Sequence, residues 1–400
     1  MSLSSLSLFP ATQAQIIESR RRTFKEWGRS MTEEEYLRRD AEMDNDEHAF
    51  NRKLITWVLC SREDPESLEF KCSCETFRRK GLVLRRNSEQ PNNDMPEEVT
   101  CYAIASVFAP ERFRHRGYAK HMMRLLHWVL ALSSSLPSTF PEAWGFPPER
   151  PIWLAYGHFS ALWSDVGHFY QSCGPTTSDS EGWVVRDAIS TVWDLKAGDM
   201  DVEDVSVSGR GLQWLSAGDV ETLHSVDDQR IMVDMAAMSL HSNPGETVLF
   251  SFLPGQGVET FQRRRLEHVW RKFKPSVEYW GVVRESKCPT EPGATTATLD
   301  KQTSIATWTF DLKPPTLFVT RLRANKETFV DLVSALKFVA RKHGMEKIEI
   351  WNLPEAHKKI AQDYGAVHME RGEHLPAFKW NGAESPSNVV WLNNEKFCWC

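Results

Sequence analysis

A strand followed by an Arg- and Gly-containing turn and a helix is the feature that most constrains this chain. Residues 99–110 form an apolar run that predicts a strand, and residues 117–132 form an amphipathic run that predicts a helix. Between strand and helix stands the pattern Arg-x-x-Gly-x-Ala, formed by Arg114, Gly117 and Ala119. Such a turn gathers unpaired backbone N–H groups at the positive end of a helix dipole, which is where a pyrophosphate binds.

The residue types in this turn suit an anion. Gly117 permits a close approach of the backbone, and Ala119 keeps the first helical turn narrow. Arg114 and Arg116 add positive charge without obstructing the amides. The spacing is neither the GxxxxGK[ST] of a P-loop nor the GxGxxG of a dinucleotide-binding fold.

Composition excludes several other classes of protein. The chain has 400 residues, of which 41% are hydrophobic and 26% charged, which is typical of a globular protein of two or three domains. No apolar run approaches the roughly 18 residues of a membrane helix, so no membrane partner is expected. A net charge of −6 without a Lys/Arg block argues against nucleic acid as a partner. Eight cysteines and no signal-peptide pattern at the start fit a reducing compartment, the cytosol or the nucleus, and we expect a cytoplasmic protein.

Hydrophobic periodicity predicts an α/β chain in two parts. The first part has these predicted elements: two helices within 12–43, strands at 54–60 and 70–79, the strand and helix described above, strands at 152–157 and 160–167, and a short helix at 168–174. The second part is predicted as helices at 216–239 and 260–272, strands at 277–283, 304–311 and 314–324, a helix at 327–344 and a strand at 347–353. The polar stretch 197–211 is a candidate linker. We therefore expect domains at 1–205 and 206–400.

The turn and the order of elements before it resemble the Gcn5-related N-acetyltransferase (GNAT) superfamily. The acetyl-CoA pyrophosphate loop of that superfamily has the form Gln/Arg-x-x-Gly-x-Gly/Ala between a strand and a helix. The resemblance implies a mixed sheet flanked by helices in the N-terminal domain, and acetyl-CoA as co-substrate. By the same resemblance, a backbone N–H of the strand near residues 106–108 polarises the thioester carbonyl. The implied cofactor-binding residues are Val107, Phe108, Arg114, His115, Arg116, Gly117, Tyr118 and Ala119.

A second match lies at residues 162–174, which are similar to the fifth strand and following helix of the superfamily. Phe169, Tyr170 and Gly174 fit a Phe-Tyr-x-x-x-Gly pattern. In several relatives the tyrosine protonates the departing CoA thiolate, so the resemblance implies that Tyr170 is a general acid. The alternative is a tyrosine that only packs beside Phe169.

The general base is harder to assign. Many superfamily members carry a Glu on the strand before the loop, whereas residues 99–109 contain no acid. An amine with a pKa near 10.4 must lose a proton before it attacks a thioester, so a base or a water chain is required. Asp165 is the nearest acid in the recognisable motifs, and it is expected to act as base or to bind a cationic substrate. A helix cap near Gly167 is an equal alternative for Asp165.

Most of the chain, including the ending VVWLNNEKFCWC, is similar to the fungal lysine N6-acetyltransferase family. That resemblance implies acetylation of the side-chain amine of free L-lysine, the first step of lysine breakdown. The C-terminal domain is then expected to complete or cover the substrate cleft, either as a degenerate GNAT-like fold or as an unrelated small α/β fold. The acid-rich residues 33–48 are either an acidic rim that attracts a cationic amine or a solvated helix face.

Other functions stay open at this point. The acceptor could be a polyamine, an aminoglycoside or a protein lysine, and a non-catalytic acyl-CoA-binding module is a rival from another class. No metal is expected, because Cys72 and Cys74 lack a second Cys/His pair at zinc spacing. The sequence predicts no oligomeric state.

Overall fold

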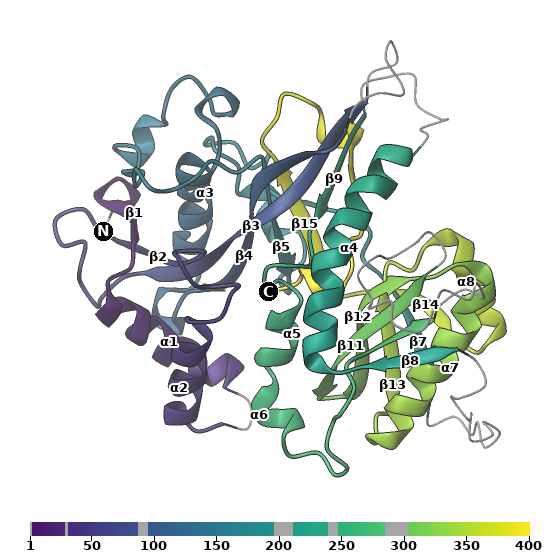
Figure 1. The fold of residues 1–400 in the computed structure, drawn as a ribbon. Coiled ribbons are helices and arrows are strands. Elements are labelled where there is room, and N and C mark those ends of the chain that lie inside the picture. The colour runs from purple at the N-terminus through teal and green to yellow at the C-terminus, as the bar shows by residue number, and fades with distance from the viewer. Residues whose placement is uncertain (1, 29–30, 87–94, 196–210, 239–246, 285–302) are drawn as a thin grey trace.

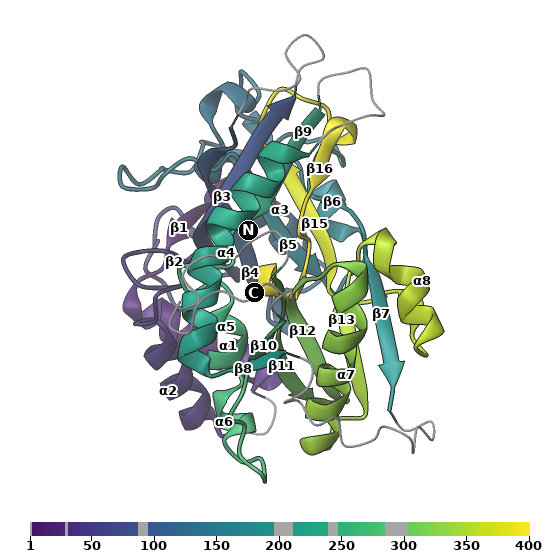
Figure 2. The ribbon, with the colours of Figure 1, turned by 45° about the vertical axis from the view of Figure 1, so that its right-hand side comes forward.

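Two β-sheets with helices packed against them form the protein, as seen in a computed structural model (Figure 1). The structure describes residues 2–28, 31–86, 95–195, 211–238, 247–284 and 303–400. The last residues of the chain lie near the middle of the molecule, beside α5 (Thr260–Arg264), in both ribbon views (Figures 1 and 2). Segments from both halves of the sequence therefore meet where the two sheets adjoin.

The first sheet has nine strands among the described residues, in the order β1-β2-β3-β4-β5-β15-β6, with β9 on the far half of β3 and β16 on β9. Their bounds are β1 (Leu6–Pro10), β2 (Leu54–Ser61), β3 (Cys72–Arg86), β4 (Glu97–Phe108), β5 (Phe159–Ser164), β6 (Val184–Val185), β9 (Thr247–Phe252), β15 (Leu375–Trp380) and β16 (Val389–Trp391). Strands β1 to β4 are antiparallel, whereas β4 and β5 are parallel. A helix, α3 (Tyr118–Leu130), connects these two parallel strands.

Apolar spacing explains why α3 forms and where it packs. Met122, Leu125, Leu126 and Val129 recur at helical spacing and are fully buried against the first sheet, together with Cys72 and Cys74 of β3. The opposite face of β3 meets α1 (Gln13–Trp27), where the Ser19 hydroxyl donates to Ser73 Oγ at 2.8 Å. Helix α2 (Glu33–Met43) follows α1 on that side and begins with a capping box at Thr32. The sheet thus has α3 on one face and α1 with α2 on the other.

The second sheet has seven strands among the described residues, in the order β14-β7-β13-β12-β11-β10-β8. Their bounds are β7 (Ile189–Asp194), β8 (Leu212–Leu215), β10 (Gly281–Arg284), β11 (Ser304–Leu312), β12 (Pro315–Arg323), β13 (Lys347–Trp351) and β14 (Val367–Glu370). The helices of this half are α4 (Ala217–Ala237), α5, α6 (Glu267–Trp270), α7 (Lys326–Lys342) and α8 (Glu355–Asp363). Strands β10, β11 and β12 form an antiparallel meander, and α7 connects β12 to the parallel strand β13. This is the same succession as β2-β3-β4-α3-β5, so the second half repeats the topology of the first.

The structure confirms most of the elements expected from periodicity and corrects two. Residues 152–157 were expected to form a strand, but Leu154 N donates to Pro151 O at 3.0 Å to close a turn, and Ile152 is fully exposed. Proline at the start of this segment favours the turn. The helix expected at 260–272 is divided into α5 and α6.

The expected boundary near residue 205 lies outside the described residues, as does all of the candidate linker 197–211 except Gly211. Strand β7 precedes this boundary but belongs to the second sheet, whereas β9, β15 and β16 follow it and extend the first sheet. The division into domains 1–205 and 206–400 stays a prediction, and the two sheets exchange strands across it.

A buried group of charges ties the second half to the C-terminal segment. Arg321 of β12 donates to Asp227 of α4 at 2.6 Å and also pairs with Glu395, while Arg323 donates to Asp227 at 2.7 Å. Glu395 accepts a further hydrogen bond from Leu322 N at 2.8 Å. Asp227 is completely buried, and these two arginines compensate its charge. The network therefore fixes the chain just before Trp399.

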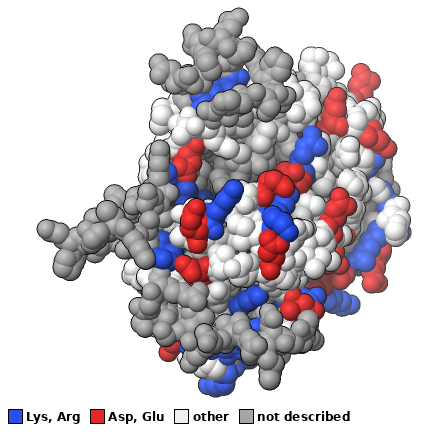
Figure 3. Space-filling model, turned by 90° about the vertical axis from the view of Figure 1, so that its right-hand side faces the viewer, with Lys and Arg blue, Asp and Glu red and all other residues white. Residues whose placement is uncertain are grey.

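On the outer surface of the second half the charged side chains are exposed, in contrast to the buried network around Asp227. The face that carries α7 and α8 shows positive and negative side chains interspersed rather than gathered by sign (Figure 3). Exposed pairs such as Lys359 with Asp363, 2.6 Å apart on α8, contribute little to stability.

Replacing Asp227 by Asn is expected to lower the free energy of unfolding by about 3 kcal/mol, because it leaves the buried guanidinium group of Arg321 and the half-buried one of Arg323 undercompensated. Urea unfolding followed by circular dichroism measures this change. The matched change Asp363→Asn at the exposed pair should have an effect below about 0.5 kcal/mol. Equal effects of the two substitutions would show that the buried network does not stabilise the fold.

The same network predicts a pH dependence. Burial would raise the pKa of Asp227, but Arg321 and Arg323 outweigh it and lower that pKa to about 2. Because the pKa is lower in the folded than in the unfolded chain, the contribution to stability is complete above roughly pH 4 and is lost as the pH falls toward about 2. The Asn variant should lack this part of the acid dependence.

Candidate functional site

The turn before α3 has the geometry of an anion-binding helix N-terminus. Gly117 is the N-cap of α3 and has a φ of 76°, a left-handed conformation that favours glycine. No atom lies within 4 Å of where a Cβ of Gly117 would stand, so the space above the turn is open. Arg114, His115 and Arg116 are exposed around it. None of the described residues in the first turn of α3 is acidic.

The guanidinium group of Arg114 has two hydrogen-bond partners within the protein. It donates to Glu26 of α1 at 2.9 Å and to the Ala109 carbonyl at 3.1 Å. Both partners of the ion pair are largely exposed, so the pair is weak and can be exchanged for a phosphate. Tyr118 is buried in the core beneath α3, and Ala119 is half-buried.

Strands β4 and β5 part before the chain reaches this turn. Their hydrogen-bonded pairing covers only Tyr102–Ile104 of β4, opposite Ser160–Leu162 of β5. Beyond this point β4 continues to Phe108, and its register against β3 shifts at a β-bulge. Ser106 lies in the bulge with a φ of 54°. Bulges leave backbone groups outside the ladder, so this stretch can donate an N–H to a ligand.

The expected cofactor residues on β4 lie on either side of this bulge. Val107 packs against the core under α3, and the Phe108 ring lies 6.0 Å from the Trp27 ring at the end of α1. The side chains of both residues are thus occupied by packing, and their predicted contact with acetyl-CoA would be made by the backbone.

A carboxylate that the sequence did not single out lies beside the bulge. Ser106 Oγ donates to Glu75 Oε2 of β3 at 2.7 Å, and Glu75 is paired with Ala105 in the sheet. Burial raises the pKa of Glu75, although Arg20 of α1 opposes the shift. A raised pKa suits a carboxylate that must exchange protons near neutral pH. The place that many GNAT relatives fill from β4 is therefore next to an acid from the neighbouring strand.

Sequence alone does not find Glu75, because its position depends on the register of β3 against β4. The alternation of residues 72–77 does give a signal: Cys72 and Cys74 are both fully buried under α3, which places Glu75 on the opposite face. A charged residue within an otherwise buried strand is the feature that could have been recognised.

Tyr170 lies on the α3 side of the sheet, opposite Glu75. It belongs to a 3₁₀ turn, η5 (Phe169–Ser172), and packs in the cluster that contains Cys74, with its ring 5.2 Å from that of Phe169. Burial raises the pKa of Tyr170, so the phenol keeps its proton at neutral pH. The carboxylate of Glu75 and the phenol of Tyr170 thus lie on opposite faces of the first sheet.

Asp165 directly follows β5 and is hydrogen-bonded to His374. Its Oδ1 accepts the backbone N–H of His374 at 2.7 Å and lies 2.9 Å from His374 Nδ1. Burial would raise the pKa of Asp165, but the contacts with His374 lower it below the ordinary value. A carboxylate held in this way is a weaker proton acceptor than Glu75, and no cap of η5 involves it, because the cap residue His168 makes no side-chain cap hydrogen bond.

The acid-rich residues 33–48 are largely neutralised. Asp44 pairs with Arg20 at 2.6 Å, Asp40 with Arg39 at 2.6 Å, and Asp46 with Arg264 at 2.9 Å. These contacts favour the solvated, ion-paired helix face over an acidic rim.

Two further observations concern metals and membranes. No group of three or more potential metal ligands occurs within the part of the chain that the structure describes. Among the same residues, no helix is both long enough and apolar enough to cross a membrane.

Comparison with known proteins identifies the family. Residues 200–400, half of the chain, match the family described as the LYC1 GNAT-like C-terminal domain. The chain belongs to this family. The repeated meander, helix and parallel strand of the second half agree with a GNAT-like fold there, and the α/β fold class predicted from sequence is confirmed.

Individual relatives are distant. An uncharacterized protein of Saccharomyces cerevisiae, YGR111W, is 23% identical over 369 residues, which make up 86% of this chain and 80% of the relative. A lysine acetyltransferase of Yarrowia lipolytica is 25% identical over 171 residues, covering 40% of this chain and 38% of that protein.

Solved structures share the fold over almost the whole chain. A probable N-acyltransferase from Enterococcus faecalis covers 93% of this chain and 71% of its own, with a TM-score of 0.50 and 9% identity. A GCN5-related N-acetyltransferase from Anabaena variabilis covers 94% and 73%, with a TM-score of 0.51 and 12% identity. Fold and family together support an acetyltransferase of the GNAT type that uses acetyl-CoA.

Introducing an acid into the first turn of α3 should have opposite effects on helix stability and on phosphate binding. Ala119→Glu should stabilise the GNAT-type helix by about 0.3–1 kcal/mol, because a negative charge there complements the dipole. The same charge should repel the pyrophosphate and raise the dissociation constant for CoA at least about tenfold. Isothermal titration calorimetry with CoA and thermal unfolding measure the two effects, with Ala119→Gln as the uncharged control. Equal CoA affinity of the two variants would contradict a pyrophosphate site at this turn.

Proposed function

We propose that this protein transfers the acetyl group of acetyl-CoA to the side-chain amine of free L-lysine, in the cytoplasm. The observation that carries the acetyl-transfer part is the arrangement at the end of β4. The open helix N-terminus at Gly117 and the bulge at Ser106 lie in one continuous segment from β4 to α3, and the half-buried carboxylate of Glu75 lies beside the bulge on the adjacent strand β3.

The residues of the turn would hold the cofactor. The first backbone N–H groups of α3, with Arg116 and the exchangeable Arg114, suit a pyrophosphate. The bulge of β4 would donate a backbone N–H to the thioester carbonyl and stabilise the oxyanion that develops during attack. These assignments use backbone geometry, which the side-chain packing of Val107 and Phe108 leaves free.

Proton transfer would run from one face of the sheet to the other. Glu75 accepts a proton from the substrate ammonium, and the neutral amine attacks the carbonyl carbon, forming a C–N bond. The C–S bond breaks, the attacking nitrogen releases its second proton to solvent, and the phenol of Tyr170 protonates the CoA thiolate and takes a proton back from solvent. Products are the acetylated amine and CoA thiol, and no covalent enzyme intermediate forms. Asp165 contributes by holding the His374 segment against the end of β5 rather than as the base.

Support for lysine as acceptor is indirect. One relative, the lysine acetyltransferase of Yarrowia lipolytica, is similar over 171 residues. The family to which the chain belongs is described by a GNAT-like domain, which agrees with acetyl transfer but does not name an acceptor. The ion pairs of Asp40 in α2 and of Asp44 directly after it weaken the acidic rim as an argument for a polycationic acceptor such as a polyamine.

An acceptor panel tests the proposal. The purified protein is given acetyl-CoA with L-lysine, L-ornithine, 1,5-diaminopentane, spermidine, an aminoglycoside or a lysine peptide, and thiol release is followed. Selective turnover of L-lysine is expected, with mass spectrometry and NMR placing the acetyl group on the side-chain nitrogen. Faster turnover of another amine would overturn lysine as substrate. Binding of acetyl-CoA without turnover of any amine would overturn the acetyltransferase assignment.

A Glu75→Gln substitution removes the carboxylate that we propose as the general base, so it should slow acetyl transfer. Glu75→Gln should lower kcat/KM by about 10²-fold to 10⁴-fold. In the wild type, activity should rise with pH through the raised pKa of Glu75, so the acidic limb lies above the ordinary value near 4.3.

Rates measured across pH with the wild type, Glu75→Gln and Glu75→Asp check this prediction. The Asp variant keeps a titrating carboxylate and should keep an acidic limb, whereas the Gln variant should lose it. CoA affinity reports whether each variant is folded, because Glu75 is not one of the residues of the turn before α3. An unchanged pH profile in Glu75→Gln would assign the base elsewhere.

A further inference from the structure

Helix α1 carries a buried arginine against the face of β3 that holds the proposed base. The hydrogen bond from Ser19 to Ser73 Oγ, 2.8 Å long, joins α1 to β3. Ser73 precedes Glu75 by two residues, so the two side chains point to the same face of the strand. Arg20, next to Ser19, is 7% exposed and interacts electrostatically with Glu75. A guanidinium group is therefore enclosed near the carboxylate of the base.

That guanidinium group is hydrogen-bonded to a different carboxylate. Nη1 and Nη2 of Arg20 donate to the two carboxylate oxygens of Asp44, at 2.9 and 2.6 Å. The Nε of Arg20 has no hydrogen-bond partner among the described residues and lies 3.9 Å from Oδ2 of Asp40. Within the same residues Glu75 forms no ion pair, and its carboxylate accepts the hydroxyl of Ser106. The two-point pairing with Asp44 thus keeps the arginine from forming an ion pair with Glu75.

Helical spacing explains how α2 brings its acids to this place. Tyr36, Asp40 and Asp44 are four residues apart, so they lie along one face of α2 and its C-cap. Tyr36 is 4% exposed, and its hydroxyl lies 3.1 Å from Oγ1 of Thr23 on α1. This contact packs α2 against α1 and places both aspartates beside Arg20.

Two other titratable groups near Glu75 are neutral. Burial raises the pKa of Tyr36 to about 12, so its phenol keeps its proton at neutral pH. Burial also raises the pKa of the Cys400 thiol, at the end of the C-terminal segment, to about 11. Neither group adds a fixed charge next to the carboxylate.

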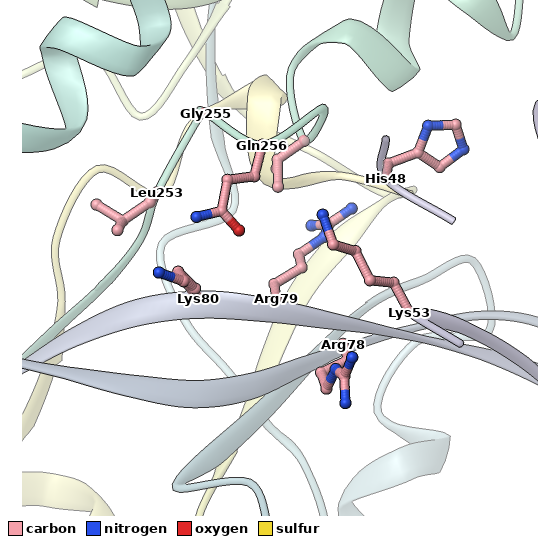
Figure 4. Close-up of a pocket in the computed structure, with 9 residues that line it drawn as sticks. His48, Lys53, Arg78, Arg79, Lys80, Leu253, Gly255 and Gln256 are labelled. Carbon is pink, nitrogen blue, oxygen red and sulfur yellow. The ribbon is translucent and has the colours of Figure 1, made fainter. Parts of the chain in front are cut away.

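A second arginine on the same face of β3 is directed elsewhere. Arg79 follows Glu75 by four residues, but its side chain points into a small basic pocket together with Lys53 and Gln256 (Figure 4). Arg79 also donates to the backbone carbonyl of Cys398. The charges that act on Glu75 therefore come from α1 and from the acidic face of α2.

We propose that Arg20 and Asp44 are positioning residues that set how readily Glu75 takes a proton from the acceptor amine. The inference rests on the proposed function, in which Glu75 is the base. Asp44 and Asp40 compensate the charge of Arg20, so Glu75 does not become the partner of a fixed ion pair and stays able to accept a proton. Arg20 in turn favours the ionised carboxylate and limits the effect of burial, so Glu75 can be charged when the acceptor arrives.

Substitutions of the two partners should move the acidic limb of the pH profile of kcat/KM in opposite directions. Arg20→Met removes the cation, which favours protonated Glu75, so the midpoint of the limb should rise by about one pH unit. Asp44→Asn keeps the size of the side chain but leaves Arg20 undercompensated, so the midpoint should fall by about half a pH unit. Arg20→Lys keeps the charge and should bring the midpoint back toward that of the wild type.

A double variant tests whether Asp44 acts through Arg20. In the Arg20→Met background there is no guanidinium group to release, so Asp44→Asn should shift the midpoint less than it does in the wild type. Equal shifts in both backgrounds would overturn the role given to Asp44.

A surface ion pair between the same two helices gives matched controls. Arg21 of α1 and Glu33 of α2 are 3.4 Å apart, and both side chains are more than half exposed. Arg21→Met and Glu33→Gln remove the same types of charge and should leave the midpoint as in the wild type. CoA affinity reports whether each variant is folded, and Asp44→Asn keeps the test valid if Arg20→Met is not.

The outcomes separate this inference from the proposed function. If Glu75→Gln loses the acidic limb while Arg20→Met and Asp44→Asn keep the midpoint of the wild type, or shift it in the same direction, the inference is overturned and Glu75 stays the base. If Glu75→Gln keeps the limb, or if no amine is acetylated, the proposed function fails and this inference fails with it.

Discussion

The pairing of β3 is the constraint on which the rest of the site depends. This strand has 15 residues and forms hydrogen bonds with β2, β4 and β9, so it joins the N-terminal meander to a strand from the second half of the chain. Its register against β4 places Glu75 beside Ser106, and its alternation places Cys74 under α3. A slip of one residue would exchange the two faces and bury the carboxylate against Met122 and its neighbours.

The C-terminal segment depends on a second constraint, which is electrostatic. Glu395 is held by Arg321 and by Leu322 N, and this fixes the backbone that leads to Trp399. Gln262 of α5 and Arg79 of β3 donate to the carbonyls of Trp399 and Cys398. The C-terminal segment is therefore held by side chains from both halves of the chain, which fixes its position where the two sheets adjoin.

Local pattern was enough to predict the turn before α3, because a strand, a left-handed glycine and an amphipathic helix are each encoded within a few residues. The conformation of Gly117 and the burial of Met122 and Leu126 agree with that prediction. Pairing between distant segments was not predictable in this way. Strands β9, β15 and β16 join the first sheet from more than 100 residues beyond β3. The position of Glu75 beside Ser106 likewise depends on the register of β3 against β4. Asp165 was singled out because it lies in a motif, whereas the structure ties it to His374, a partner 209 residues away.

A strand is a precise support for the proposed base. The spacing between Glu75 and the bulge at Ser106 is set by the register of β3 against β4, which side-chain motion does not change. An acceptor that presents its amine to Glu75 and to the thioester would therefore be positioned by the sheet rather than by a loop. A displacement of about 1 Å at the bulge would then be enough to slow attack greatly, because attack requires close and aligned reacting atoms.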